Sequence, residues 1–436
     1  MEKYRDRIRR FRAGRPVLCA LCAAAVMLAL AAAVTGCRHT FSKYYTGVWD
    51  GYSELTAVGR IVQVQQGWSG QSGFLGTYTD DWNDGEGYRW LKEPVKASDM
   101  DGYRAYVHQS GLQGSFFGAL ARLLRVINGE ARLNALYFTA STLFYALAFW
   151  LCLALGRRLG PGAGLAAAAC VVFSPWLTSG VKNLYWVLFT WLLPLAAGVG
   201  QCAFFRREGR FSRRWLALAF GAVLVRCLCG FEYISTLLIL MEAPLVLAWA
   251  EDKPRRMAWL RQMVRTGLAG LGGVLAALLV WLGQCWHYYG SLAEALQCVL
   301  GTALARMGVE GAGVEVIQTG GELSRLDVIL QFFLESGPVV SLGSLEVTLP
   351  PLAAAALAAA LLVKALEKGE KPLSRALGWL LLLSAAAPAS WMLLAKEHAA
   401  LHAHLTPMLW NFALVPACGA ALGCAAEVLA RRLIKQ

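Results

Sequence analysis

The chain has 436 residues, of which 57% are hydrophobic and 16% are charged, and its formal net charge is +13. Soluble domains carry about 25% charged residues, so this deficit, with repeated apolar runs of about twenty residues, excludes an ordinary soluble enzyme and predicts a polytopic membrane protein. The basic residues cluster between the apolar runs, as in cytoplasmic loops. The sequence has neither a nucleic-acid-binding motif nor a P-loop, and no nucleic-acid partner is expected.

Residues 1–36 begin with the basic segment "MEKYRDRIRRFRAGR" and continue into an apolar run that is long enough to cross a bilayer. This pattern predicts a cytoplasmic N-terminus followed by a first transmembrane helix. A cleaved signal peptide is the alternative, because "VTGC", which ends at Cys37, loosely resembles a lipoprotein cleavage box.

Residues 37–130 form the long polar region that we expect to be the first extracytoplasmic loop. Near its end, "SFFGALARLLRVI" has apolar residues at helical spacing while Arg122 and Arg125 lie off that stripe, which predicts a helix in the membrane interface. The acidic stretch "TDDWNDGEGYR" suggests either a calcium loop or a solvated turn. Its spacing departs from the EF-hand pattern, which favours the turn.

Nine further apolar runs follow the first. They lie at about 133–156, 161–180, 184–205, 215–231, 233–250, 266–288, 348–366, 376–395 and 405–430. The sequence therefore predicts an all-α integral membrane protein with about ten transmembrane helices. Helices 2–7 would occupy residues 131–288 and helices 8–10 residues 348–436, with a second large extracytoplasmic loop over 289–347. That loop contains "RLDVILQFFLES", another short amphipathic stretch.

The charge distribution predicts the orientation of these helices. An even number of spans assigns both ends and four connecting segments to the cytoplasm. These segments hold 26 of the 41 Lys and Arg residues but only 8 of the 28 Asp and Glu residues. The asymmetry favours an N-in, C-in protein of the cytoplasmic membrane, with residues 37–130 outside.

Asp50 and Glu54 lie early in the predicted outer loop and are four residues apart. On a helix they would share a face. A carboxylate held near the outer surface is a candidate general base for an acceptor hydroxyl or amine. The alternative is a pair of solvated acids in an exposed loop.

Two basic residues stand near the predicted outer ends of the helices. Lys182 lies in the short outer turn "SGVKNLYW", and Arg226 lies within a predicted span. An arginine there is costly unless it is paired, which makes it a functional candidate, and Glu232 is its candidate partner. A purely structural Arg–Glu pair is the alternative. Glu242, another acid within a span, receives no assignment.

The segment "KEHAALHAHL" gathers three of the six histidines between two apolar runs. On a helix, His398 and His402 would share a face, and His404 would point elsewhere. A metal site, a binding site for an anionic headgroup and an ordinary loop are the three interpretations. The spacing is not that of a zinc helix, so no metal or other cofactor is predicted, although a divalent ion stays open. Imidazoles that donate hydrogen bonds to phosphate are favoured.

The architecture resembles that of the GT-C glycosyltransferases, which are polytopic enzymes that use sugars carried on polyprenyl phosphates. The resemblance lies in the early acid, in "SELTAVGRIVQ" after it, and in "SPWLTSGVKNLYWVLFTWLLPL", "RCLCGFEYIS" and "KEHAALHAHLTPMLW". It implies sugar transfer from a polyprenyl-phosphate donor to an extracytoplasmic glycan, lipid or protein. The paired "DE" of the protein mannosyltransferases is missing, which leaves the sugar and acceptor open.

The resemblance also implies roles for particular residues. Asp50 would be the catalytic base, with Glu54 beside it. The phosphate ligands are expected on other grounds, because a lipid-phosphate donor needs cations and hydrogen-bond donors at the outer headgroup level. The candidates are Lys182, Arg226, His402 and His404, with Glu232 and His398 in support.

Two other classes of function compete with this one. A transporter or flippase of a polar lipid would use the same basic residues without a carboxylate at a reaction centre. A non-catalytic membrane protein of envelope assembly would use the outer loop as a protein-binding surface.

Overall fold

The structure is a computed structural model, and it describes residues 16–42, 44, 49–67, 73–78, 86–93, 102–307, 323–367 and 373–434. Within these ranges, seven helices are long and apolar enough to cross a membrane. They are α2 (Pro16–Phe41), α6 (Gly129–Leu159), α11 (Ile234–Glu251), α12 (Arg256–Tyr289), α15 (Leu349–Leu366), α16 (Leu373–Leu394) and α18 (Pro407–Leu433). The chain is therefore a helical, multi-pass membrane protein, as its composition predicts.

The other three predicted spans coincide with helices that are shorter or carry charges. These helices are α7 (Pro161–Val172), α9 (Phe189–Glu208) and α10 (Arg213–Cys229). The predicted span 161–180 is divided, because Ser174 caps a separate short helix, α8 (Pro175–Gly180), and Pro175 cannot continue α7. At 1.5 Å per residue α7 is about 18 Å long, well short of a bilayer core of about 30 Å.

Hydrogen-bonding caps fix where several helices begin. The side chain of Asn128 accepts the amide of Ala131 at the start of α6, and Ser212 does the same for Trp215 in α10. Ser291 caps α13 (Leu292–Arg306), and Ser324 forms a capping box at the start of α14 (Arg325–Leu334). These side chains satisfy amides that have no partner within the helix. The predicted amphipathic helix in the second outer region is α14.

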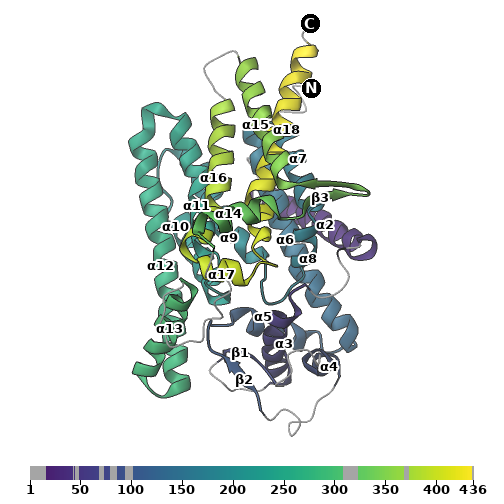
Figure 1. The fold of residues 1–436 in the computed structure, drawn as a ribbon, viewed down its shortest axis with the longest axis vertical. Coiled ribbons are helices and arrows are strands. Elements are labelled where there is room, and N and C mark those ends of the chain that lie inside the picture. The colour runs from purple at the N-terminus through teal and green to yellow at the C-terminus, as the bar shows by residue number, and fades with distance from the viewer. Residues whose placement is uncertain are drawn as a thin grey trace.

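Residues of the predicted first outer loop form a small layer at one end of the bundle, at the bottom of Figure 1. It contains α3 (Gly51–Gln66), α4 (Glu86–Lys92), α5 (Leu112–Leu123) and a two-stranded antiparallel sheet of β1 (Leu75–Thr77) and β2 (Arg104–Tyr106). The predicted interfacial helix is α5. It begins earlier and ends earlier than the sequence suggests, and Phe117 and Ala121 are buried while Phe116 and Leu123 are exposed.

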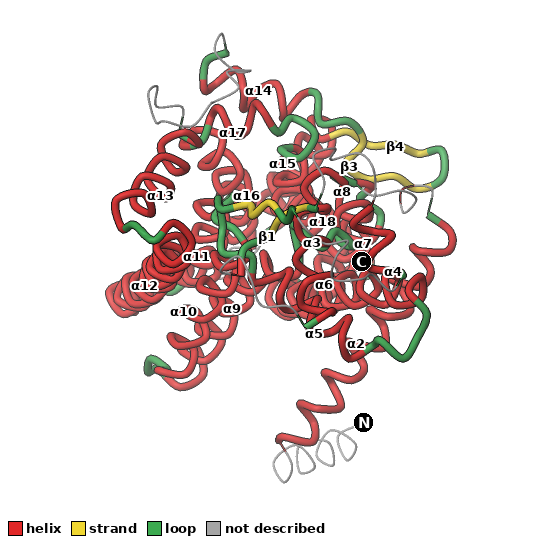
Figure 2. The backbone as a smooth tube through the Cα atoms, turned by 90° about the horizontal axis from the view of Figure 1, so that it is seen from below, coloured by secondary structure: helices red, strands yellow, loops and turns green. Residues whose placement is uncertain are grey.

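The remaining short elements lie beside the long helices. They are the 3-10 turn η4 (Lys253–Arg255), β3 (Pro338–Leu342), β4 (Leu345–Thr348) and α17 (Lys396–Leu401). The strands β3 and β4 pair as an antiparallel hairpin. Seen from below, α12 and α13 lie at one edge of the bundle and α2 at another (Figure 2). The helix α17, which carries the first histidine of the cluster, packs against α13, α14 and α16.

The helices α7 and α18 pack closely against each other through glycines. A Cβ added at Gly423 would overlap the backbone oxygen of Gly162, and one at Gly419 would lie 2.8 Å from the backbone oxygen of Ala166. Small residues four apart let two membrane helices approach at backbone distance. Many buried residues of α18 belong to the same hydrophobic cluster as those of α7, so this contact helps to hold the two helices in the core.

We expect Gly423→Ala to lower the free energy of unfolding by about 1–3 kcal/mol, because the added methyl group must push α7 away from α18. A suitable measurement is denaturant-induced unfolding in detergent micelles. Gly378→Ala in α16 is the matched control, since a Cβ there meets no atom within 4 Å. Equal stability of the two variants would contradict this account of the α7–α18 contact.

Candidate active site

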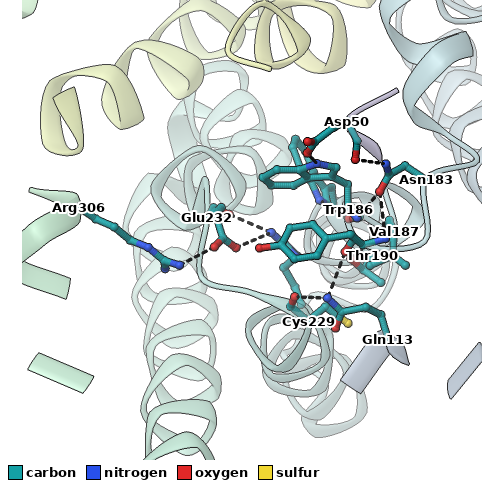
Figure 3. A network of polar contacts seen from close by, with 12 residues as sticks. Asp50, Gln113, Asn183, Trp186, Val187, Thr190, Cys229, Glu232 and Arg306 are labelled. Carbon is teal, nitrogen blue, oxygen red and sulfur yellow. Dashed lines mark hydrogen bonds and ion pairs between the residues drawn. The ribbon is translucent and has the colours of Figure 1, made fainter. Parts of the chain in front are cut away.

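Asp50 stands at the head of α3 and is held by two hydrogen-bond donors. Its backbone is left-handed (φ 52°, ψ 54°), and as N-cap its side chain accepts the amide of Ser53 at 3.4 Å. The other carboxylate oxygen accepts the indole N–H of Trp186 at 2.6 Å (Figure 3). Only 5% of the side chain is exposed. The carboxylate therefore has a fixed orientation, and each oxygen keeps a lone pair for a further contact.

Asn183 fixes the segment that supplies Trp186. Its amide donates to the backbone oxygen of Trp49 at 2.6 Å, and its own oxygen accepts the amides of Tyr185 and Trp186 at 2.9 and 3.0 Å. The segment between α8 and α9 is thereby folded around one side chain and attached to the residue before Asp50. This attachment joins the layer of α3, α4 and α5 to the helix bundle.

The backbone at this site is strained in three places. Among the described residues, the non-glycine positions with positive φ are Asp50, Val187 (φ 41°) and Tyr233 (φ 63°). Trp186, which precedes Val187, lies with its ring 5.8 Å from that of Tyr233. A left-handed conformation is costly for a β-branched residue. Such strain gathers where a fold is held for a function, and here all three positions surround one indole ring.

The histidine segment lies across from Asp50. The Nε2 atom of His404 is 3.8 Å from Oδ1 of Asp50, and 55% of the His404 side chain is exposed. The ring of His402 lies 5.7 Å from that of His404 and 4.5 Å from that of His398. Because α17 ends at Leu401 with His402 as its C-cap, the chain leaves the helix and carries His404 to the carboxylate. His398 is buried against the rings of Tyr233 and Trp391.

The protonation states differ along this row. Burial alone would raise the pKa of Asp50, but the contacts with His404, Trp186 and Ser53 outweigh it and lower the pKa below its ordinary value. Burial, followed by the neighbouring His404, lowers the pKa of His402. Burial also holds the pKa of His398 well below its ordinary value. At neutral pH the site thus presents an ionised carboxylate beside neutral imidazoles at His402 and His398.

A second charged cluster surrounds Glu232, just before α11. Glu232 accepts from the guanidinium of Arg306 at 2.6 Å and lies 3.8 Å from that of Arg226, which also donates to the Glu232 backbone oxygen at 3.1 Å. Arg226 is buried and lies over the ring of Trp191. Two cations therefore face one carboxylate, and the cluster keeps a net positive charge. Arg306 comes from α13 and is the more accessible of the two arginines.

The two clusters meet around Tyr233 and Gln113. Burial and the negative charges of Glu232 and Asp50 raise the pKa of Tyr233, which places its ring within reach of both carboxylates. Gln113 of α5 donates to the backbone oxygens of Tyr185 and Cys229 at 3.1 and 2.8 Å (Figure 3). One side chain of the outer layer thus connects the segment that carries Trp186 with the one that carries Glu232.

Glu54 and Lys182 form a separate buried group. Glu54 accepts hydrogen bonds from the hydroxyls of Tyr88 and Tyr137 at 2.6 and 3.0 Å and from the amide of Leu184 at 2.6 Å. Lys182 lies over the ring of Tyr137 at 5.8 Å. Burial raises the pKa of Glu54 to about 7, although the hydrogen bonds and Lys182 oppose the shift. The fully buried Glu54 fastens α3 to α4, α6 and the segment before α9.

The structure thus brings together six of the predicted residues. They are Asp50, Arg226, Glu232, His398, His402 and His404. Sequence reasoning missed Trp186, Asn183, Tyr233 and Arg306. The quoted motifs contain the first three but give no sign of their contacts, and Arg306 ends a helix in a loop that had no assigned role.

Three acids of the "TDDWNDGEGYR" stretch, Asp80, Asp81 and Asp84, lie outside the described residues, and Glu86 begins α4. Within the described part of the chain, no three His, Cys, Asp or Glu side chains are grouped to hold a metal ion. Both carboxylate oxygens of Glu242 are buried without a hydrogen-bond partner there, and its role stays unassigned.

Comparisons with known proteins add no name to this arrangement. No family model matches the chain, and neither the curated proteins nor the solved structures contain a match.

The buried Glu54 should make the stability of the protein depend on pH. Its pKa of about 7 in the folded state lies above the ordinary value of 4.5. Its stabilising contribution is therefore complete below about pH 4.5 and is lost as the pH rises to about 7, by about 3 kcal/mol. The variant Glu54→Gln has no carboxyl group to ionise at this position. We therefore expect the apparent melting temperature of the wild type to fall relative to that of the variant as the pH rises from about 4.5 to about 7.

Glu294→Gln is the control for this measurement, because Glu294 is exposed on α13. It should leave the pH profile of the melting temperature unchanged. A Glu54→Gln profile that runs parallel to that of the wild type would contradict the raised pKa.

Proposed function

We propose that the protein is a membrane glycosyltransferase of GT-C type, which moves a sugar from a polyprenyl-phosphate donor to an extracytoplasmic acceptor. The observation that carries the proposal is Asp50. This carboxylate, at the head of α3, has a pKa below its ordinary value and a fixed orientation, and it faces the exposed side chain of His404. A general base needs that combination of ionisation, fixed geometry and access. The resemblance drawn from the sequence motifs points to the same residue.

In the proposed reaction, Asp50 accepts the proton of the acceptor hydroxyl. The acceptor oxygen then forms a bond to the anomeric carbon while the bond from that carbon to the phosphate oxygen breaks. The leaving polyprenyl phosphate keeps the electron pair of the broken bond. Because it leaves as an anion, it needs stabilisation of charge more than a proton.

Hydrogen-bond donors and cations near Asp50 would stabilise the leaving phosphate. His404 is the nearest, and His402 lies directly behind it. Arg306 would contribute the excess positive charge of the cluster around Glu232. Arg226 and His398 are buried and would position these groups. We assign Glu54 and Lys182, which were predicted as helper base and phosphate ligand, to the attachment of α3 instead.

The proposed enzyme would be oriented with both ends in the cytoplasm and α3 outside the cytoplasmic membrane. The excess of Lys and Arg over Asp and Glu in the two ends and the four connecting segments assigned to the cytoplasm supports this orientation. A total of ten spans would require α7 with α8, α9 and α10 to cross together with the seven longer helices.

Asp50→Asn is the decisive variant. Asparagine keeps an oxygen that can accept from Trp186 or the Ser53 amide, so α3 and its cap should persist, but it cannot take up the proton of the acceptor. We expect sugar transfer to fall by about 100- to 10,000-fold. The measurement is the transfer of radiolabelled sugar from a panel of polyprenyl-phosphate hexoses and pentoses to membrane acceptors, with the protein reconstituted in vesicles.

The controls separate this proposal from the competing functions. Glu294→Gln, at an exposed position of α13, should retain full transfer. Movement of the labelled lipid across the vesicle bilayer without a covalent product, equal in wild type and Asp50→Asn, would identify a flippase. Capture of an envelope protein that depends on the outer layer and not on Asp50, without transfer, would identify a scaffold. Unchanged transfer by Asp50→Asn would overturn the assignment of the base.

His404→Ala tests the stabilisation of the leaving phosphate. Its side chain is more than half exposed, so the fold should tolerate the change. We expect kcat to fall by about 100-fold, which is typical for the loss of one donor to a developing anion. His287→Ala, at an exposed position of α12, is the matched control. Equal kcat values for the two variants would remove His404 from the proposed mechanism.

A further inference from the structure

An apolar cavity of about 660 Å³ lies among α6, α9, α11, α16 and α18. Leu151, Leu155, Val199, Leu247 and Pro416 are among the side chains that line it. Its size is within the range of about 300–1,000 Å³ that is usual for ligand sites. None of the residues assigned above to Asp50 or its partners lines this space. The cavity is therefore separate from the candidate active site.

Four arginines line the same cavity at the ends of two helices. Arg157 and Arg158 lie in the last turn of α6, and Arg206 and Arg207 in the last turn of α9. Arg158 and Arg206 share Glu251, at 2.8 and 2.7 Å.

Arg207 contacts Glu208 at 2.8 Å. Four cations thus face two carboxylates. The negative ends of the two helix dipoles carry about half a charge each and offset part of this excess. The mouth of the cavity, which is the end that the four arginines line, therefore keeps a net positive charge.

The mouth is far from the candidate active site along the membrane-spanning direction. Tyr137, which contacts Glu54, and Arg158 both belong to α6. They are 21 positions apart, which on a helix is a rise of about 30 Å, about the thickness of the hydrocarbon core. In Figure 1 the outer layer lies at the bottom, and the C-terminal half of α18 rises to the top. The arginines therefore lie near the opposite headgroup level from Asp50.

A tryptophan marks the same level. Trp215, in the first turn of α10, lines the cavity and packs so closely on α9 that a Cβ at Gly200 would overlap its ring. Tryptophan is enriched where the hydrocarbon core meets the headgroups. An apolar slot that ends in cations at this level matches a molecule with an apolar chain and an anionic head.

We propose that this cavity binds an anionic phospholipid, with an acyl chain between α6 and α9 and the phosphate at the four arginines. A free phosphate would use the arginines alone, and an uncharged lipid would use only the apolar walls. The positive charge of the mouth selects an anion, and the apolar side chains that line the cavity select a molecule with an acyl chain. This inference does not rest on the proposed sugar transfer, because it involves other residues at the other end of the bundle.

The test compares phosphatidylglycerol, phosphatidylcholine and inorganic phosphate as ligands of the full chain purified in detergent. Native mass spectrometry counts bound lipid, and the melting temperature reports stabilisation. Phosphatidylglycerol should bind about tenfold more tightly than phosphatidylcholine, because both lipids carry a phosphate but the positive choline group of the second is repelled by the arginines. Phosphate alone should neither bind nor stabilise. Equal binding of the two lipids, or equal stabilisation by phosphate, would overturn the proposal.

Variants locate the lipid. The double variant Arg157→Gln, Arg207→Gln changes two exposed residues of the mouth and should reduce the affinity for phosphatidylglycerol to that for phosphatidylcholine. Arg210→Gln, Arg213→Gln removes the same charge from exposed positions that do not line the cavity, and should have no effect. Ala203→Trp would fill part of the cavity and abolish the binding of both lipids. If that variant fails to fold, the two double arginine variants still test the proposal. Equal affinities of these two variants for phosphatidylglycerol would overturn the proposed site.

Asp50→Asn separates this proposal from the proposed enzyme. It should bind phosphatidylglycerol as the wild type does, whatever happens to sugar transfer. A loss of lipid binding in Asp50→Asn would place the lipid at the candidate active site and would overturn the separate cavity.

Discussion

The attachment of the segment between α8 and α9 to the head of α3 is the contact on which the rest of the site depends. Asn183 binds the backbone before Asp50, the indole of Trp186 binds the Asp50 carboxylate, and the amide of Leu184 binds Glu54. All three bonds are 2.6 Å long and come from donors within residues 183–186. Together they fix the head of α3 relative to the segment that carries Trp186, and so set the position of Asp50 in the site.

Two carboxylates four residues apart acquire opposite properties from this attachment. Spacing alone makes Asp50 and Glu54 equivalent candidates, because both would lie on one face of a helix. The structure separates them. Asp50 is the cap and faces His404, whereas Glu54 lies in the first turn and is sealed by two tyrosines and an amide. Burial and hydrogen bonding therefore decide which acid is ionised, and neither can be read from the spacing.

The sequence predicts the helices well and their interruptions poorly. Apolar runs of about twenty residues mark the long helices correctly, because the bilayer imposes their length. The run over 161–180 looks like one span, yet it is divided where Ser174 and Pro175 begin α8. The approach of α7 to α18 also lacks a clear signal, since glycines far apart in the chain matter only when their helices meet.

The site shows the same limit in a different form. Asp50 and the histidines could be found because titratable groups are rare in such an apolar chain. Their adjacency could not, because it depends on α17 ending at Leu401, which lets His404 leave the face shared by His398 and His402. Arg306 could not be found either, since its partner Glu232 lies 74 residues away. Composition thus identifies the titratable groups of the candidate site, whereas helix ends and strained turns, at Asp50, Val187 and Tyr233, bring them together.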